Sequence, residues 1–287
     1  MKLGLYKIPR NRGIQLKKKH ISQSADDYDY LDGVLEKTSD NLDTFMDILK
    51  YCKNENVDLL MHDDIVRNLN TEIVFKYNHI IFAEFADKFN KIKKYVDKHK
   101  INLYIYTSLF AGLNSKRIEL REKSRRDIQM KAKLLDAVGG KGMIYAVSTL
   151  NNMGLVAGME AIFDSYALIR TELTDKYMML SNGTNCLTFE DVLACKKKYG
   201  CRTVYQPSVD YQKNFMRYGF DAKYDELCAK VADLVMFSPF DRVPHPKKKE
   251  LIEIGDFPDY YYDIDGTIII NTYHSDDSID LIREWEK

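Results

Sequence analysis

The sequence has no excess of charge of either sign, because its 43 lysine and arginine residues balance 43 aspartate and glutamate residues. Proteins that hold nucleic acid by neutralising phosphates usually carry a basic excess or a basic face. Composition therefore gives no support to a nucleic-acid partner. Short basic clusters within residues 10–19 and 247–249 are interpreted as solvated loop charges, and a phosphate-binding patch is the alternative.

Cysteine is scarce, and its spacing excludes the common motifs. The five cysteines, at positions 52, 186, 195, 201 and 228, contain no Cys-x-x-Cys pair. Many zinc sites and redox motifs are built on such pairs. We therefore expect reduced, mostly buried thiols, and no bound metal or cofactor. A glycine-rich nucleotide loop is also missing, because the glycines of residues 139–142 precede an expected strand rather than a helix.

The chain also lacks a hydrophobic run long enough to cross a membrane. Its start does not resemble a signal peptide, because charged residues interrupt the apolar segment that a signal peptide requires. We therefore expect a cytoplasmic protein with no membrane partner. Hydrophobic residues make up 45% of the 287, enough to bury a large core. Length alone permits two domains, but barrels of about 250 residues fold as one unit. Residues 1–287 are accordingly expected to form a single domain.

Eight short apolar segments, each followed by a helical pattern, indicate the architecture. They are continuous apolar runs, typical of strands in a sheet that is covered on both faces. The helical pattern repeats every 3.6 residues, as over residues 42–52. Strand followed by helix, eight times, predicts a (β/α)8 TIM barrel, an α/β fold, with long loops at its C-terminal face. The expected strands are residues 2–8, 57–62, 101–106, 143–148, 177–182, 202–206, 234–238 and 267–273.

Three segments exceed a minimal barrel. Residues 9–37 form a long first connection, and its acidic, tyrosine-rich tail at residues 25–31 is predicted to be a flexible loop. Residues 71–100 are predicted to form one long helix, which is apolar on more than one face in its early half. Residues 240–265 contain three prolines and are predicted to be a long loop before the last strand.

Three tracts, in order along the chain, resemble the UV damage endonuclease family. Residues 102–115, NLYIYTSLFAGLNS, lead to a helix ending LLDAVG, like the family's strand, its loop to Leu-Asn-Ser and its helix closing on Leu-Asp-x-x-Gly. Residues 187–200, LTFEDVLACKKKYG, resemble the helix after the family's fifth strand. The opening KLGLY and the first helix are similar to the corresponding elements. The resemblance implies a TIM barrel from a DNA-repair family that nicks DNA beside a lesion with a cluster of metal ions.

The same resemblance implies that this chain lacks the family's metal ligands. Metal ions at a phosphodiester site need carboxylates and imidazoles, which neutralise the ion and lower the pKa of bound water. The residues at the matching positions cannot do this together: Tyr106 stands for a histidine, residues 146–149 for His-x-Gly-Gly, Ser181 and Asn182 for Glu-Asn, Gln206 and Val209 for an aspartate and a histidine, and Asn271 and Tyr273 for a glutamate and a lysine.

The expected barrel mouth is neutral and rich in hydroxyl and amide groups. Such a lining can hydrogen-bond a small polar ligand, but it offers no strong nucleophile or base. The binding residues expected there are Tyr106, Ser148, Ser181, Asn182, Gln206, Asn271 and Tyr273.

Leu109 and Phe110 match the glutamine and aromatic residue with which the family probes a duplex at a lesion. They preserve an apolar wedge, and aromatic side chains can stack on bases or unstack them. The alternative is that both pack within a loop or at a subunit interface.

The leading hypothesis is a non-catalytic relative, a pseudoenzyme, that binds a nucleic acid, a protein partner or, as a homo-oligomer, a second copy of itself. The alternative is an enzyme with a rebuilt site, a hydrolase or isomerase acting on a small polar or phosphorylated substrate. Barrel geometry gathers the ends of all strands over one mouth, so histidines and aspartates there can form an acid–base pair. The catalytic candidates are His62, Asp64, Asp241, His245 and His274.

Overall fold

The computed structural model describes residues 1–5, 16, 26–61, 65–107, 112–147, 149–183, 186–210, 221–238, 240–242, 251–253, 258–271 and 275–285, and of residues 240–242, 251–253, 275–278 and 284 it describes the backbone alone. Within these residues, no helix is long and apolar enough to cross a membrane.

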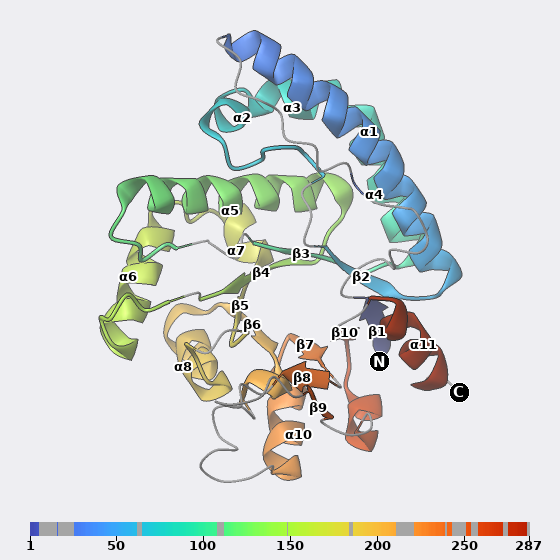
Figure 1. Cartoon of the computed structure of the whole chain (residues 1–287), viewed down its shortest axis with the longest axis vertical. Helices are drawn as coiled ribbons and strands as arrows, with labels where there is room; N and C mark the ends of the chain where they lie inside the picture. The colour runs from blue at the N-terminus through green and yellow to red at the C-terminus, as the bar shows by residue number, and fades with distance from the viewer. Residues whose placement is uncertain are drawn as a thin grey trace.

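Eight parallel strands close into a barrel, in the order β1-β10-β7-β6-β5-β4-β3-β2 (Figure 1). Each strand is short and almost wholly buried, which is why its sequence reads as an unbroken apolar run. The predicted (β/α)8 fold is confirmed, and each predicted strand overlaps an observed one. The strands are β1 (Lys2–Leu5), β2 (Asp58–Met61), β3 (Leu103–Tyr106), β4 (Gly142–Ala146), β5 (Met178–Ser181), β6 (Arg202–Tyr205), β7 (Leu234–Phe237) and β10 (Thr267–Ile270).

Helices surround the barrel and cover its outer face (Figure 1). Their apolar stripes pack on the outward-facing strand residues, and a smaller apolar cluster, including Leu60, Ile144 and Met236, fills the interior. The helices are α1 (Asp27–Asn54), α2 (Glu72–Lys76), α3 (Asn78–Glu84), α4 (Ala86–His99), α5 (Ile118–Val138), α6 (Leu155–Ala167), α7 (Glu172–Tyr177), α8 (Phe189–Tyr199), α10 (Ala222–Val231) and α11 (Ser275–Trp285).

The N-terminal end of the barrel interior is closed by a polar cluster around Asp58. This carboxylate is fully buried and lies 2.7 Å from the Lys2 ammonium group. It also accepts hydrogen bonds from the Thr267 hydroxyl at 2.6 Å and from the backbone and side-chain nitrogens of Asn102 at 2.7 and 2.8 Å. One side chain thereby ties together the beginnings of β1, β2, β3 and β10.

Two predictions for the connecting segments are wrong. Within the predicted first connection, residues 27–37 belong to α1, so the tail at 25–31 is not a flexible loop. The Asp26 side chain accepts a hydrogen bond from Tyr28 N, and acidic residues in the first turn favour a helix start. The predicted long helix at residues 71–100 is three helices, interrupted at Tyr77 and Phe85. The interruptions turn successive apolar faces toward the core, where Val74, Ile81 and Phe89 are buried.

The predicted loop at residues 240–265 also contains regular structure. Strands β8 (Phe240–Arg242) and β9 (Leu251–Glu253) pair in antiparallel orientation, and a 3-10 helix spans Asp259–Asp263. The Tyr261 side chain from this 3-10 helix is fully buried and meets Phe237 edge-on, with ring centroids 5.5 Å apart. The aromatic run therefore anchors this connection to the barrel.

Candidate functional site

The carboxyl ends of β3, β5 and β6 bring together three of the polar residues expected at the barrel mouth. Gln206 Nε2 donates hydrogen bonds to the Tyr106 hydroxyl at 3.3 Å and to Ser181 Oγ at 3.1 Å. It also lies 3.5 Å from the Met236 sulfur, which belongs to the apolar layer of the barrel interior. All three polar side chains are buried, so they form a compact neutral cluster at the top of the barrel.

Gly183 makes room for this cluster. A Cβ atom at this position would lie 2.2 Å from Gln206 Nε2, which is closer than any real contact. The Gly183 backbone nitrogen donates to Ser181 Oγ at 3.0 Å, so the chain after β5 also fixes the serine hydroxyl. The missing side chain thus permits the amide of Gln206 to turn toward Ser181 and Tyr106.

Asn182 bonds to the backbone of Gln206 and to a carboxylate, rather than to the side chains of the polar cluster. Its amide joins the ends of β5 and β6, donating to Gln206 O at 3.1 Å and accepting from Gln206 N at 2.8 Å. It also donates to the buried carboxylate of Asp210 at 3.1 Å. Asp210 in turn accepts from Phe189 N at 2.8 Å and from the Tyr224 hydroxyl at 3.2 Å, which connects the mouth to α8 and α10.

A buried ion pair on α5 contacts the end of β3, and sequence analysis did not identify it. Lys131 on α5 donates to the Tyr106 carbonyl at 2.8 Å, and its ammonium group lies 3.1 Å from the Asp127 carboxylate. Both side chains are almost fully buried, at 3% and 1% exposure. The sequence could have indicated this pair, because Asp127 and Lys131 are four residues apart on the apolar face of a helix.

The remaining predicted site residues are described in part or lie outside the described residues. Asn271 follows β10, is half-buried, and donates its backbone N–H to Phe237 O at 2.8 Å. For Asp241 only the backbone, in β8, is described. The mouth residues Ser148 and Tyr273, the wedge residues Leu109 and Phe110, and the catalytic candidates His62, Asp64, His245 and His274 lie outside the described residues.

The described mouth residues do not fit a metal ion. Burial raises the pKa of the Tyr106 hydroxyl above its ordinary value, although the hydrogen bond with Gln206 acts in the opposite direction. The phenol is therefore protonated at neutral pH, and amide and hydroxyl groups bring no negative charge to offset an ion. Within the described part of the chain, no three His, Cys, Asp or Glu side chains gather closely enough to hold a metal. The arrangement is suited to hydrogen bonding.

Buried phenols and thiols give the protein a pH dependence on the alkaline side. Burial raises the pKa of the Tyr145 hydroxyl and raises that of Cys52 from its ordinary value of 9.0 to about 12. Groups with raised folded-state pKa values stabilise the fold fully below their unfolded pKa, and this contribution disappears as pH rises through the folded pKa. We expect the urea midpoint to fall between pH 9.0 and about 12.

Urea denaturation at a series of pH values, followed by circular dichroism, measures this dependence. Cys52→Ala should make the decline shallower, because one of the ionising groups is then missing. A midpoint that stays constant, or rises, through this pH range would contradict the assignment of buried neutral thiols and phenols.

Comparison with known proteins gives one sequence family and a set of structures. The profile of the family described as UV-endonuclease UvdE matches residues 7–207. A search of curated proteins finds no match to the sequence.

Three solved structures illustrate the likeness of fold. The structure described as SacUVDE is similar with a TM-score of 0.79 at 13% identity, covering 100% of this chain and 98% of that one. Endonuclease IV from Thermus thermophilus gives 0.60 at 10% identity, with 100% and 99% covered. The E. coli 3-keto-D-glucoside 4-epimerase YcjR gives 0.55 at 10% identity, again with 100% and 99% covered. Identities this low show a shared fold alone.

Proposed function

The chain belongs to the UV-endonuclease UvdE family, and from that membership we propose that it binds DNA at its barrel mouth without metal-dependent cleavage. The family resemblance implies both recognition of DNA and its hydrolysis, and the proposal keeps only the recognition. The residues at the barrel mouth bear on hydrolysis, and the basic residues at the start of α5 bear on DNA binding.

The observation that carries the proposal is the Tyr106–Gln206–Ser181 cluster. It occupies the carboxyl ends of three strands, which is where enzymes of this fold place their catalytic groups. Its members are hydrogen-bonded to one another at 3.1 and 3.3 Å, and none of them is a carboxylate or an imidazole. A phosphodiester hydrolase of this family would need several negatively charged or imidazole ligands here to hold its ions.

Binding is supported by basic residues where α5 begins, next to the loop that follows β3. Lys116 and Arg117 are exposed there, and Arg117 is the N-cap residue without a side-chain capping bond. Arg121 and Arg125 line an adjoining hollow of about 360 Å³, where Arg125 is paired with Glu122 and Arg121 donates to Ser115 O. The N-terminus of a helix attracts phosphate through its free N–H groups and its dipole. The basic residues at the start of α5 therefore offer a phosphate contact, although the net charge of the whole chain is zero.

The test measures metal, cleavage and binding on the same preparation. After loading with manganese and zinc and desalting, we expect less than about a tenth of an equivalent of metal, and no nicking of UV-irradiated plasmid. Fluorescence anisotropy should detect binding to a labelled duplex, with an affinity that falls steeply as salt rises. The double variant Lys116→Glu with Arg117→Glu should weaken binding by about tenfold or more, since two phosphate contacts become repulsive.

The matched control is Lys94→Glu with Lys98→Glu, which makes the same charge change at exposed positions of α4. It should bind DNA nearly as the unaltered protein does. Stoichiometric metal together with nicking would overturn the non-catalytic part of the proposal. Undetectable or salt-independent DNA binding, or equal weakening in both double variants, would overturn the binding part.

A further inference from the structure

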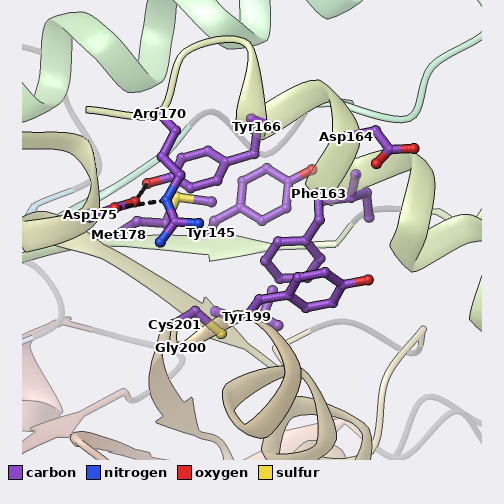
Figure 2. Close-up of a pocket in the computed structure, with 13 residues that line it drawn as sticks. Tyr145, Phe163, Asp164, Tyr166, Arg170, Asp175, Met178, Tyr199, Gly200 and Cys201 are labelled. Carbon is purple, nitrogen blue, oxygen red and sulfur yellow. Dashed lines mark hydrogen bonds and ion pairs between the residues drawn. The ribbon is translucent and has the colours of Figure 1, made fainter. Parts of the chain in front are cut away.

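A cavity of about 350 Å³ lies on the outer side of β4 and β5, between the helices that connect these strands and the end of α8 (Figure 2). Its volume is in the range of pockets that hold small organic molecules, about 300–1,000 Å³. None of its lining residues belongs to the polar cluster at the barrel mouth. It is thus a second candidate site, distinct from the polar cluster, and it shares Asp164 with the hollow beside the start of α5.

The floor and one wall of this flank cavity are apolar. Tyr145, Met178 and Leu180 project outward from the two strands and are buried, at 0%, 5% and 1% exposure. Phe163 from α6 and Tyr199 from α8 stack on one another to form the wall, with ring centroids 3.7 Å apart and planes within 11°. Such a lining accommodates a flat ring, which aromatic side chains contact favourably through their edges and faces.

The cavity is also lined by a guanidinium group, that of Arg170. Arg170 Nε donates to Asp175 Oδ2 at 2.8 Å, and the other Asp175 oxygen accepts from the Tyr166 hydroxyl at 2.9 Å. Figure 2 shows the two terminal nitrogens of Arg170 on the side of the guanidinium group that faces away from Asp175. The contact with Asp175 uses Nε. The two terminal nitrogens form the edge of the guanidinium group that can bind a carboxylate through two parallel hydrogen bonds.

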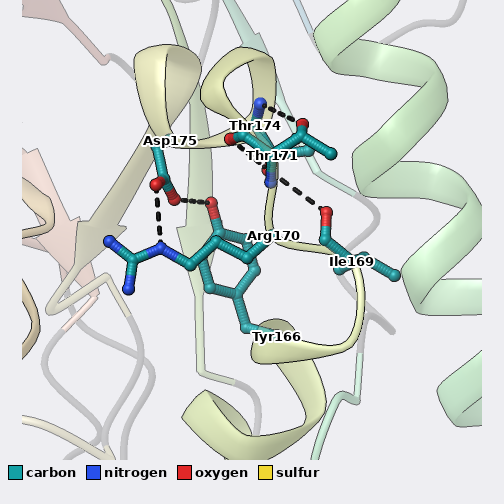
Figure 3. Close-up of polar contacts among 6 residues, drawn as sticks. All are labelled: Tyr166, Ile169, Arg170, Thr171, Thr174 and Asp175. Atoms are coloured by element: carbon teal, nitrogen blue, oxygen red, sulfur yellow. Dashed lines mark hydrogen bonds and ion pairs between the residues drawn. The ribbon is translucent and has the colours of Figure 1, made fainter.

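The backbone that carries Arg170 is held in place by its neighbours (Figure 3). Thr171 and Thr174 form a reciprocal capping box at the start of α7, with bonds of 3.1 and 2.8 Å. The Thr174 hydroxyl also donates to Ile169 O at 3.3 Å. Because Arg170 lies between these fixed residues and its side chain is held by Asp175, little further ordering is needed when an anion binds.

We propose that the flank cavity binds a small aromatic monocarboxylate. The carboxylate pairs with the terminal nitrogens of Arg170, and the ring lies against the half-buried pair formed by Phe163 and Tyr199. Asp164 and Asp175 also line the cavity and outnumber its one cation, so an anion binds only by direct pairing with Arg170, and the additional charge of a dicarboxylate or a phosphate dianion is disfavoured. The chemistry of the ligand therefore follows from the terminal nitrogens of Arg170, two nearby carboxylates and an apolar, aromatic lining.

Ligand-observed saturation-transfer NMR and calorimetry with phenylacetate test the proposal, with phenylacetamide as the uncharged analogue and phenethylamine as the cationic one. We expect phenylacetate to bind saturably with a Kd of about 1 mM or below. Both analogues should bind at least about tenfold more weakly, because they cannot accept the paired hydrogen bonds.

Two variants assign the binding to this cavity. Arg170→Gln removes the charge at a side chain that is 56% exposed, so the fold is retained, and it should weaken phenylacetate binding about tenfold or more. Ala167→Phe, at an exposed position that lines the cavity, should block entry. The control is Arg283→Gln, which removes another exposed arginine paired with a carboxylate, Glu55, at 2.7 Å.

The control should bind phenylacetate as the unaltered protein does. The proposal is overturned if phenylacetate shows no saturable binding, if the amide or the amine binds as tightly, or if both cavity variants bind normally. DNA binding in Arg170→Gln should be unchanged, so this proposal and the proposed function can fail independently.

Discussion

Asp58→Ala should destabilise the protein by about 3–5 kcal/mol, the usual cost of removing one partner from a buried, hydrogen-bonded ion pair. The fully buried Asp58 carboxylate interacts with Lys2, Thr267 and Asn102 at distances between 2.6 and 2.8 Å. Alanine leaves the Asn102 N–H groups and the Thr267 hydroxyl without this acceptor inside the barrel, and it leaves the Lys2 ammonium group without its counter-ion. Urea denaturation followed by circular dichroism measures the loss.

The control is Asp47→Ala, which removes an ion pair of the same length, 2.7 Å to Lys50, between side chains that are more than half exposed. Surface pairs contribute about 0–1 kcal/mol, so this variant should be nearly neutral. A cost of less than about 1 kcal/mol for Asp58→Ala would show that the strand beginnings are held by apolar packing alone.

The barrel could be predicted from the sequence because its strands are defined locally. Each is a short apolar run bounded by polar residues, and the observed strands begin and end within about three residues of the predicted ones. The helix at residues 27–54 was predicted only in part. The acidic run at its N-terminus was interpreted as a loop, although aspartates at a cap and in a first turn are an ordinary helix-start signal.

The mouth could be predicted only in its residue types. Strand ends of a closed barrel must meet, so Tyr106, Ser181 and Gln206 were expected near one another, and their hydrogen bonds place them together. Their exact partners depend on long-range packing. Nothing local indicates that Asn182 bonds to Asp210, which is 28 residues away. The break in the predicted long helix at Tyr77 and Phe85 has the same origin, because an apolar residue off the main stripe is buried only if the helix bends.

The flank cavity was not predicted, because its components come from separate elements. Arg170 follows α6, Tyr145 lies in β4, and Tyr199 ends α8. In sequence, Arg170 with Asp175 resembles an ordinary surface ion pair. Only the closed barrel places this pair beside an apolar floor, which changes its expected role from a solvated contact to a binding group.

Lys131→Met should destabilise the protein by about 3–5 kcal/mol, because it leaves the buried Asp127 carboxylate without this cation and the Tyr106 carbonyl without this donor. Asp127→Leu in the same chain should recover part of the loss, since hydrophobic residues of similar volume replace a buried pair at little cost. Lys123→Met, on the exposed face of the same helix, should change stability by about 0.5 kcal/mol or less. Urea denaturation of the four chains forms the comparison. If the double variant is no more stable than Lys131→Met alone, the loss comes from the Tyr106 carbonyl, and the lysine acts mainly by holding the end of β3 in position at the mouth.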